Sequence, residues 1–211
     1  MTELITYRGG SCGDFLKVLL SNCDYELDKT GKVHTPNTFD YTRATRELIE
    51  LGEDIDTIVK KCIRYKERHG NNKNLDYITS HDFPVFVERY NSGIEFFDYV
   101  EKLSIDRVLL ISITTEKSLR FRTLNSLIKS HNKTYDDYIE HYNRYGKTQL
   151  ELYKKDVEIF NNYKRECDIT LELEHIYDKE YLRKFLIENY SWTDDNYDTV
   201  YDYYMSKQKK L

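Results

Sequence analysis

The residues with the clearest chemical potential form a glycine-rich turn within "TYRGGSCGDFLKVLL", which spans 6–20. Glycine lets a backbone approach an anion closely, because it has no Cβ atom and accepts either sign of φ. The serine adds a hydroxyl donor, and the arginine adds a fixed positive charge. The turn consists of Arg8, Gly9, Gly10, Ser11, Cys12 and Gly13. This composition predicts a cradle for a phosphate-like anion, and the alternative is a tight turn that binds nothing.

The segments around this turn predict a strand before it and a helix after it. A short apolar run lies within 3–7, and apolar residues recur at helical spacing over 14–21. A strand-to-helix turn offers free backbone N–H groups at the helix N-terminus, which suit an anion. Asp14 stands at this helix start, where a carboxylate can instead act as a cap. The loop lacks the lysine of the GK[ST] signature, which weakens the interpretation as a nucleotide kinase or triphosphatase.

A histidine at the predicted end of another strand is a candidate general base. His81 lies in "YITSHDFPVFV", residues 77–87, after a strand predicted over 75–79. A near-neutral imidazole at a strand end can take a proton from an acceptor hydroxyl. The alternative is a loop histidine that caps Asp82 or the backbone.

The rest of the chain alternates predicted strands with predicted helices. The run "RVLLISI", residues 107–113, is apolar on both faces, as is typical of a central parallel strand. The predicted strands are 3–7, 32–35, 75–79, 107–113 and 168–175, and the predicted helices are 14–21, 41–51, 54–68, 92–103, 116–130, 134–165, 178–189 and a terminal helix that begins at 193–195. This alternation predicts an α/β fold with a mainly parallel sheet between helices, a helix-rich C-terminal third and a single domain over 1–211.

Composition narrows the classes of partner. The chain has 211 residues, a formal net charge of −5 and a pI near 5.7, which argues against a general nucleic-acid or acidic-membrane binder. No apolar run approaches the length of about 18 residues that a membrane span needs, and the first residues lack a signal-peptide layout, so we expect a cytoplasmic protein. Its four cysteines show no CxxC spacing, so the sequence predicts neither a metal site nor a disulfide framework. A single alanine beside abundant Lys, Asn, Tyr and Ile fits an AT-rich source such as a phage.

Three segments, in order, resemble those of the sulfotransferases. "YRGGSCGDFLKVLL" resembles the family's first phosphosulfate-binding loop, with one extra residue in the turn. "YITSHDFPVFV" resembles the segment with the catalytic histidine, although Thr79 and Ser80 stand where the family has a lysine. "RVLLISITTEKSLRFRTLNSLIKSH" resembles the strand and helix that bind the donor 3′-phosphate, although Thr114, Thr115 and Glu116 replace the usual Arg-Asn-Pro. The later segment "DITLELEHIYDKEYLRKFLIENYSW" resembles the family's architectural strand, acidic turn and helix.

The resemblance implies a P-loop, sulfotransferase-like three-layer fold and the transfer of a sulfuryl group from 3′-phosphoadenosine-5′-phosphosulfate to a hydroxyl acceptor. His81 would be the base, and Arg8 would stabilise charge on the leaving phosphate. The loop from Arg8 to Gly13 would hold the 5′-phosphosulfate, and Arg122 and Ser126 are weaker candidates for the 3′-phosphate. The acceptor would be a small molecule or a glycan, and no metal is required.

The competing hypothesis is a sulfotransferase-like fold that has lost its donor site and acts as a structural or interaction protein. The missing 3′-phosphate arginine, the missing lysine before His81 and the tyrosine-rich C-terminal third all favour it. Its partners would be proteins, and in a phage-encoded protein it would be a virion component. Neither hypothesis calls for a nucleic acid or a membrane.

Overall fold

The structure is a computed structural model of the whole chain. It describes residues 2–8, 12–21, 26–27, 33–34, 48–49, 51–69, 77–81, 83–90, 93–118, 140, 147–193 and 196–207.

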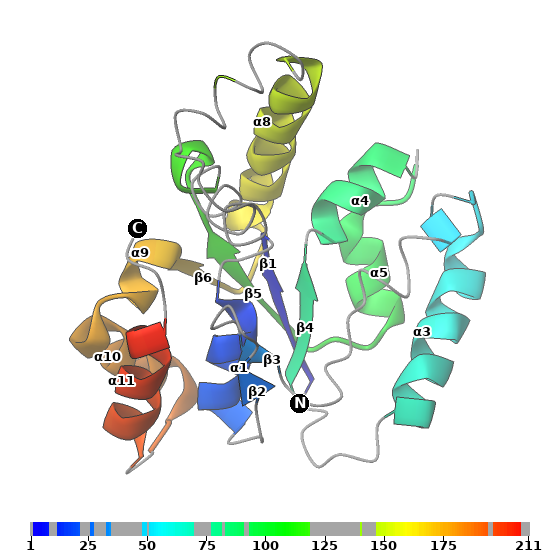
Figure 1. The fold of residues 1–211 in the computed structure, drawn as a ribbon. Helices are drawn as coiled ribbons and strands as arrows, with labels where there is room; N and C mark the ends of the chain where they lie inside the picture. Colours follow the sequence, from blue (N-terminus) through cyan, green and yellow to red (C-terminus); the bar gives the residue numbers. More distant parts are fainter. Residues whose placement is uncertain are drawn as a thin grey trace.

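A four-stranded parallel sheet forms the centre of the molecule (Figure 1). Its strands, in the order β4-β1-β5-β6, are β4 Tyr77–His81, β1 Glu3–Tyr7, β5 Arg107–Ser112 and β6 Ile169–Glu172. All five residues of β1 are buried, and five of the six residues of β5 are buried, because helices cover both faces of these central strands. A separate antiparallel pair joins β2 Glu26–Leu27 to β3 Val33–His34.

Helices cover both faces of this sheet and make three layers. They are α1 Gly13–Ser21, α3 Ile55–His69, α4 Phe83–Tyr90, α5 Phe96–Lys102, α8 Lys147–Asn162, the 3₁₀ turn η1 Tyr163–Arg165, α9 Leu173–Ile176, α10 Lys179–Tyr190 and α11 Tyr197–Lys207. Figure 1 shows α1, α10 and α11 on one side of the sheet and α3, α4 and α5 on the other. The parallel α/β architecture expected from the sequence is therefore confirmed.

Strand alternation divides the buried side chains between two faces. Ile5, Leu109 and Leu171 pack with α1, α9, α10 and α11 on the first face. Leu4 and Val108 pack with α3 and α5 on the second face, where Leu110 meets α4 and α8. Because successive side chains of a strand point to opposite faces, one sheet contributes side chains to two apolar layers.

Several boundaries differ from the expectations. The strand predicted over 75–79 is β4 at 77–81, so His81 is the last residue of the strand and does not lie in the turn predicted after it. The helix α4 was not predicted, because its Pro84 follows turn-forming residues; proline is equally at home in the first turn of a helix. The strand predicted over 168–175 ends at Glu172, where the chain turns at once into α9. None of the described helices is both long enough and apolar enough to cross a membrane.

Candidate functional site

The strand register places the residues of interest at one edge of the sheet. Tyr7, the last residue of β1, lies level with His81 on one side and with Ile111 on the other. The ends of β1 and β4 therefore lie side by side, and Arg8 directly follows β1. Helix α1 begins just beyond β1, and its N-terminus therefore lies at this carboxyl edge.

The order of the strands makes this edge a topological switch point. The chain leaves β1 for β4 on one side and later returns past β1 to form β5 on the other. In open parallel sheets such a reversal leaves a crevice beyond the carboxyl ends of the strands, and ligands bind there. The switch point of this chain lies at β1.

The first turn of α1 is tightly packed against the end of β1. A Cβ atom on Gly13 would lie 2.1 Å from Cδ1 and Cε1 of the Tyr7 ring, so only glycine fits. Cys12 precedes it with φ of 63°, and its carbonyl accepts the first helical hydrogen bond from the Leu16 N–H at 3.0 Å. The backbone N–H groups of this first turn have no helical acceptor, and they give the helix N-terminus a partial positive charge.

The side chain of Cys12 contacts two tyrosines. The Tyr204 hydroxyl donates to Cys12 Sγ at 3.2 Å, and the Tyr177 hydroxyl lies 3.6 Å from the same sulfur. Burial raises the pKa of the Cys12 thiol, while the two tyrosine hydrogen bonds act in the opposite direction. Cys12 and Gly13 can therefore offer an anion their backbone N–H groups but not the thiol.

Arg8 brings a positive charge to the carboxyl edge of the sheet. Its side chain is only 6 % exposed. Two buried hydroxyl residues, Thr6 and Ser80, lie level with each other on neighbouring strands just before the strand ends. The site thus combines a guanidinium, hydroxyl groups and a helix N-terminus, which are all chemistry for an anion.

The end of β5 lies on the other side of β1 and is held by two hydrogen bonds. Thr114 Oγ1 accepts a hydrogen bond from the Lys117 N–H at 3.3 Å and caps the helical residues 115–118. Asn161 of α8 donates from Nδ2 to the Ile113 carbonyl at 2.9 Å. The Thr114-Thr115-Glu116 opening of this helix is therefore a capping sequence, and it stands where the resembling family has Arg-Asn-Pro.

The predicted site residues are described unevenly. Arg8, Cys12 and Gly13 lie at the carboxyl edge, together with the backbone of His81. Gly9, Gly10, Ser11, Arg122, Ser126 and the side chain of His81 lie outside the described residues. Sequence reasoning missed Tyr177 and Tyr204, which lie 165 and 192 residues from Cys12, and no local sequence signal connects them to it.

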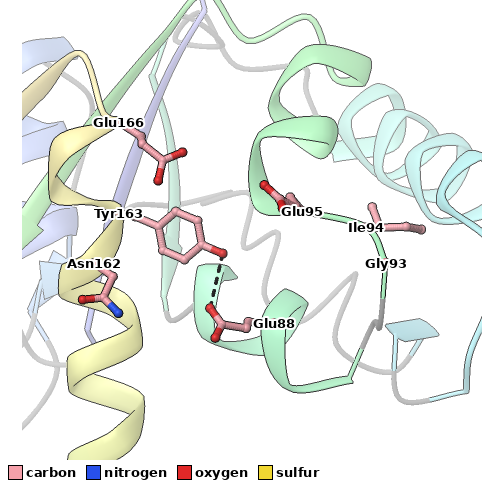
Figure 2. A pocket seen from close by; sticks show the side chains of 7 residues that line it. All are labelled: Glu88, Gly93, Ile94, Glu95, Asn162, Tyr163 and Glu166. Carbon is pink, nitrogen blue, oxygen red and sulfur yellow. Dashed lines mark hydrogen bonds between the residues drawn. The ribbon is translucent and has the colours of Figure 1, made fainter.

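A cavity lies apart from the residues that the sequence singled out. It has a volume of about 410 Å³ and is lined by Glu88 of α4, by Gly93, Ile94 and Glu95 before α5, and by Asn162, Tyr163 and Glu166 around η1. Figure 2 shows the Tyr163 ring between α4 and α8, with its hydroxyl directed at Glu88. The Tyr163 hydroxyl lies 3.5 Å from Glu88 Oε2.

The electrostatics of this cavity disfavour an anionic ligand. Burial is the main cause that raises the pKa of Tyr163 to about 12, and the carboxylates of Glu88, Glu95 and Glu166 add to the rise. The carboxylates line an open surface and all three are exposed. An anionic ligand is therefore not expected in this cavity.

Among the described residues, no three His, Cys, Asp or Glu side chains come together as a possible metal site. Comparison of the chain with known protein families, with characterised proteins and with solved structures finds no match.

Proposed function

We propose that this chain is a sulfotransferase-like protein that binds 3′-phosphoadenosine-5′-phosphosulfate at the carboxyl edge of its sheet and transfers the sulfuryl group to a hydroxyl acceptor. The observation that carries the proposal is the register of β1 and β4, which sets Arg8 and His81 at adjacent strand ends. The N-terminus of α1 and the topological switch point lie at the same edge. In this proposal the protein has a P-loop-like three-layer fold.

The residues divide the work of the reaction between them. The acceptor oxygen forms a bond to sulfur while the bond between sulfur and the 5′-phosphate oxygen breaks, and adenosine 3′,5′-bisphosphate leaves with the electron pair. His81 takes the proton of the acceptor hydroxyl. Arg8 and the first N–H groups of α1 stabilise the negative charge that develops on the leaving phosphate, so catalysis rests on position and electrostatics.

The turn residues Gly9, Gly10 and Ser11 complete the cradle for the 5′-phosphosulfate in this proposal, and Arg122 and Ser126 are the candidates for the 3′-phosphate. A small molecule or a glycan is the acceptor.

A second candidate is a non-catalytic protein of the same fold that binds protein partners, for example in a virion. Two observations favour it. The Cys12 side chain is bound by tyrosines of the protein itself, and the capping sequence Thr114-Thr115-Glu116 opens the helix after β5, where the resembling family has Arg-Asn-Pro. In both features, groups at the carboxyl edge of the sheet are bound by other groups of the protein, as a protein without a donor site would have them.

Ligand-induced stabilisation separates the two candidates. At a concentration of adenosine 3′,5′-bisphosphate about 100 times its Kd, a donor site adds about 2.7 kcal/mol, or roughly 5–10 °C in melting temperature for a chain of this length. Arg8→Ala abolishes the rise and His81→Ala keeps it, each measured against the same variant without ligand. Arg165→Ala, at an exposed arginine of η1, is the control and keeps the full rise.

Because Arg8 is buried, Arg8→Lys is included to keep a positive charge in the core; it folds and gives a reduced rise, since an ammonium cannot reproduce the planar donors of a guanidinium. No rise in the wild type at millimolar ligand eliminates the donor site and favours the non-catalytic candidate. A rise in the wild type is followed by an acceptor screen in which His81→Ala loses transfer but retains binding.

A further inference from the structure

The C-terminal helix reaches the start of α1 from the other end of the chain. The Tyr204 hydroxyl donates to Cys12 Sγ at 3.2 Å, and the Tyr204 ring stacks on Phe15 with centroids 3.8 Å apart and planes 4° from parallel. Both contacts fall on the first turn of α1 and the residue before it. Figure 1 shows α11 close beside α1.

Cys12 has a backbone conformation that needs support. Its φ of 63° is left-handed, and a residue with a Cβ atom adopts this region at a steric cost. The side chain is 8 % exposed, so water does not compete for the sulfur. Tyr204 and Tyr177 instead hold the sulfur between two hydroxyl groups, and the conformation of Cys12 is fixed through its side chain.

Helix α11 is itself anchored, so it can act as a fixed support. The Tyr201 hydroxyl donates to the Ile176 carbonyl at 3.1 Å, and the Tyr197 hydroxyl donates to the Lys179 carbonyl at 2.7 Å. These two bonds tie α11 to α9 and α10. The third tyrosine of the same buried stripe, Tyr204, then transmits this anchorage to α1.

The first turn of α1 also contacts Tyr7. The Tyr7 ring fills the space where a Cβ atom on Gly13 would lie. The start of α1 is thus held between Tyr7 at the end of β1 and Tyr204 of α11.

We infer that Tyr204 is a positioning residue for the carboxyl-edge site: through Cys12 it holds the first turn of α1 in the orientation that presents its N–H groups at the sheet edge. The consequence for anion affinity rests on the proposed function. The consequence for the backbone rests only on the contacts, and it is measured without any ligand.

Hydrogen exchange at the Leu16 amide reads the backbone directly, because this N–H donates to the Cys12 carbonyl at 3.0 Å. Removing the Tyr204 hydroxyl with Tyr204→Phe accelerates exchange at Leu16 about fivefold, the effect of one lost hydrogen bond. The Leu182 amide, which donates to the Asp178 carbonyl in α10, is the internal control and keeps its rate. Tyr203→Phe, at an exposed tyrosine of the same helix, leaves both rates unchanged.

A second background tests whether the effect runs through Cys12. Glycine adopts a φ of 63° without support, so Tyr204→Phe adds no further acceleration at Leu16 in a Cys12→Gly protein. Equal acceleration in both backgrounds overturns the inference, because Tyr204 then acts through general packing. Unchanged exchange at Leu16 in Tyr204→Phe overturns it also.

A binding measurement with adenosine 3′,5′-bisphosphate separates this inference from the proposed function. Tyr204→Phe weakens binding about fivefold and Tyr203→Phe leaves it unchanged. If the wild type does not bind, the donor site fails while the exchange data still decide the positioning role. If the wild type and Tyr204→Phe bind equally, the positioning role at the site is wrong and the donor site stands.

Discussion

Glu3 carries a carboxylate into the protein at the amino end of β1. The residue is fully buried, the Tyr190 hydroxyl donates to its Oε1, and Arg107 Nη1 lies 3.6 Å from its Oε2. Burial is the largest cause of the rise in the pKa of Glu3; Tyr190 and Arg107 oppose the rise, and Asp168 adds to it. The native protein therefore holds the Glu3 proton to a higher pH than the unfolded chain does.

This linkage has a definite sign. Between the ordinary value of 4.5 and the raised pKa of Glu3 in the folded state, the native state binds more protons, so the free energy of unfolding falls as pH rises. Glu3→Gln removes this dependence. We expect the melting temperature of the wild type, relative to that of Glu3→Gln, to be highest below pH 4.5 and to decline above it. A difference that is flat or that grows with pH contradicts the assignment.

Thr79 is a buried residue whose polar group is expected to lower the stability of the protein. Its hydroxyl is buried in β4 without a hydrogen-bond partner among the described residues, and its side chain lies level with Ile5. Thr79→Val removes a desolvated polar group, so we expect urea unfolding to show a gain of about 1 kcal/mol. Thr170→Val is the control, since Thr170 Oγ1 donates to the Lys164 carbonyl at 3.2 Å and its loss costs about 1 kcal/mol. A loss of stability in Thr79→Val shows that the hydroxyl is needed.

At the scale of elements, the junction of β1 with α1 depends on Gly13. Gly13→Ala forces a Cβ atom against the Tyr7 ring, and overpacking of this kind costs roughly 1–3 kcal/mol in chemical denaturation. Tyr7→Leu removes the ring, so the double variant loses less than the sum of the two single losses. Gly52→Ala is the control for backbone strain alone, because Gly52 has φ of 71° with no atom within 4 Å of its Cβ position. Additive losses at Gly13 and Tyr7 contradict the predicted clash.

The sequence predicted those elements in which local pattern and tertiary position agree. β1 and β5 are continuous apolar runs that are buried on both faces, and α3 follows a clear helical period, so each was placed within a residue or two. β6 was overextended, because "DITLELEH" alternates like a strand while the chain turns into α9 at Leu173. The two-residue strand β2 is too short to leave a pattern.

For the candidate site, the sequence predicted the residues at the strand ends but not the contacts made by distant parts of the chain. Residues at strand ends, such as Arg8 and His81, follow from the predicted strands and the parallel order. The tyrosines that hold Cys12 come from α11 and from the residue after α9, and only the packing of the whole chain brings them there.

At the scale of the molecule, one sheet separates two apolar layers that are built from different parts of the chain. The first face draws on α1 and on the C-terminal helices, and the second draws on α3, α4, α5 and α8. β1 and β5 contribute side chains to both layers. Unfolding of either strand therefore exposes apolar side chains of both layers. The two faces are therefore expected to unfold in one cooperative transition.

The single tryptophan makes this expectation measurable. Trp192 packs on the first face, where its Nε1 donates to the Leu19 carbonyl at 2.7 Å. Phe96 is fully buried on the second face, in edge contact with Phe97 and Tyr163. Phe96→Leu removes about 1–1.5 kcal/mol, or roughly 2–6 °C in melting temperature, and the Trp192 fluorescence transition shifts by the same amount as the circular dichroism transition. A fluorescence midpoint that stays at the wild-type value while the circular dichroism midpoint falls shows that the two faces unfold separately, and the role of the shared strands in coupling them is then wrong.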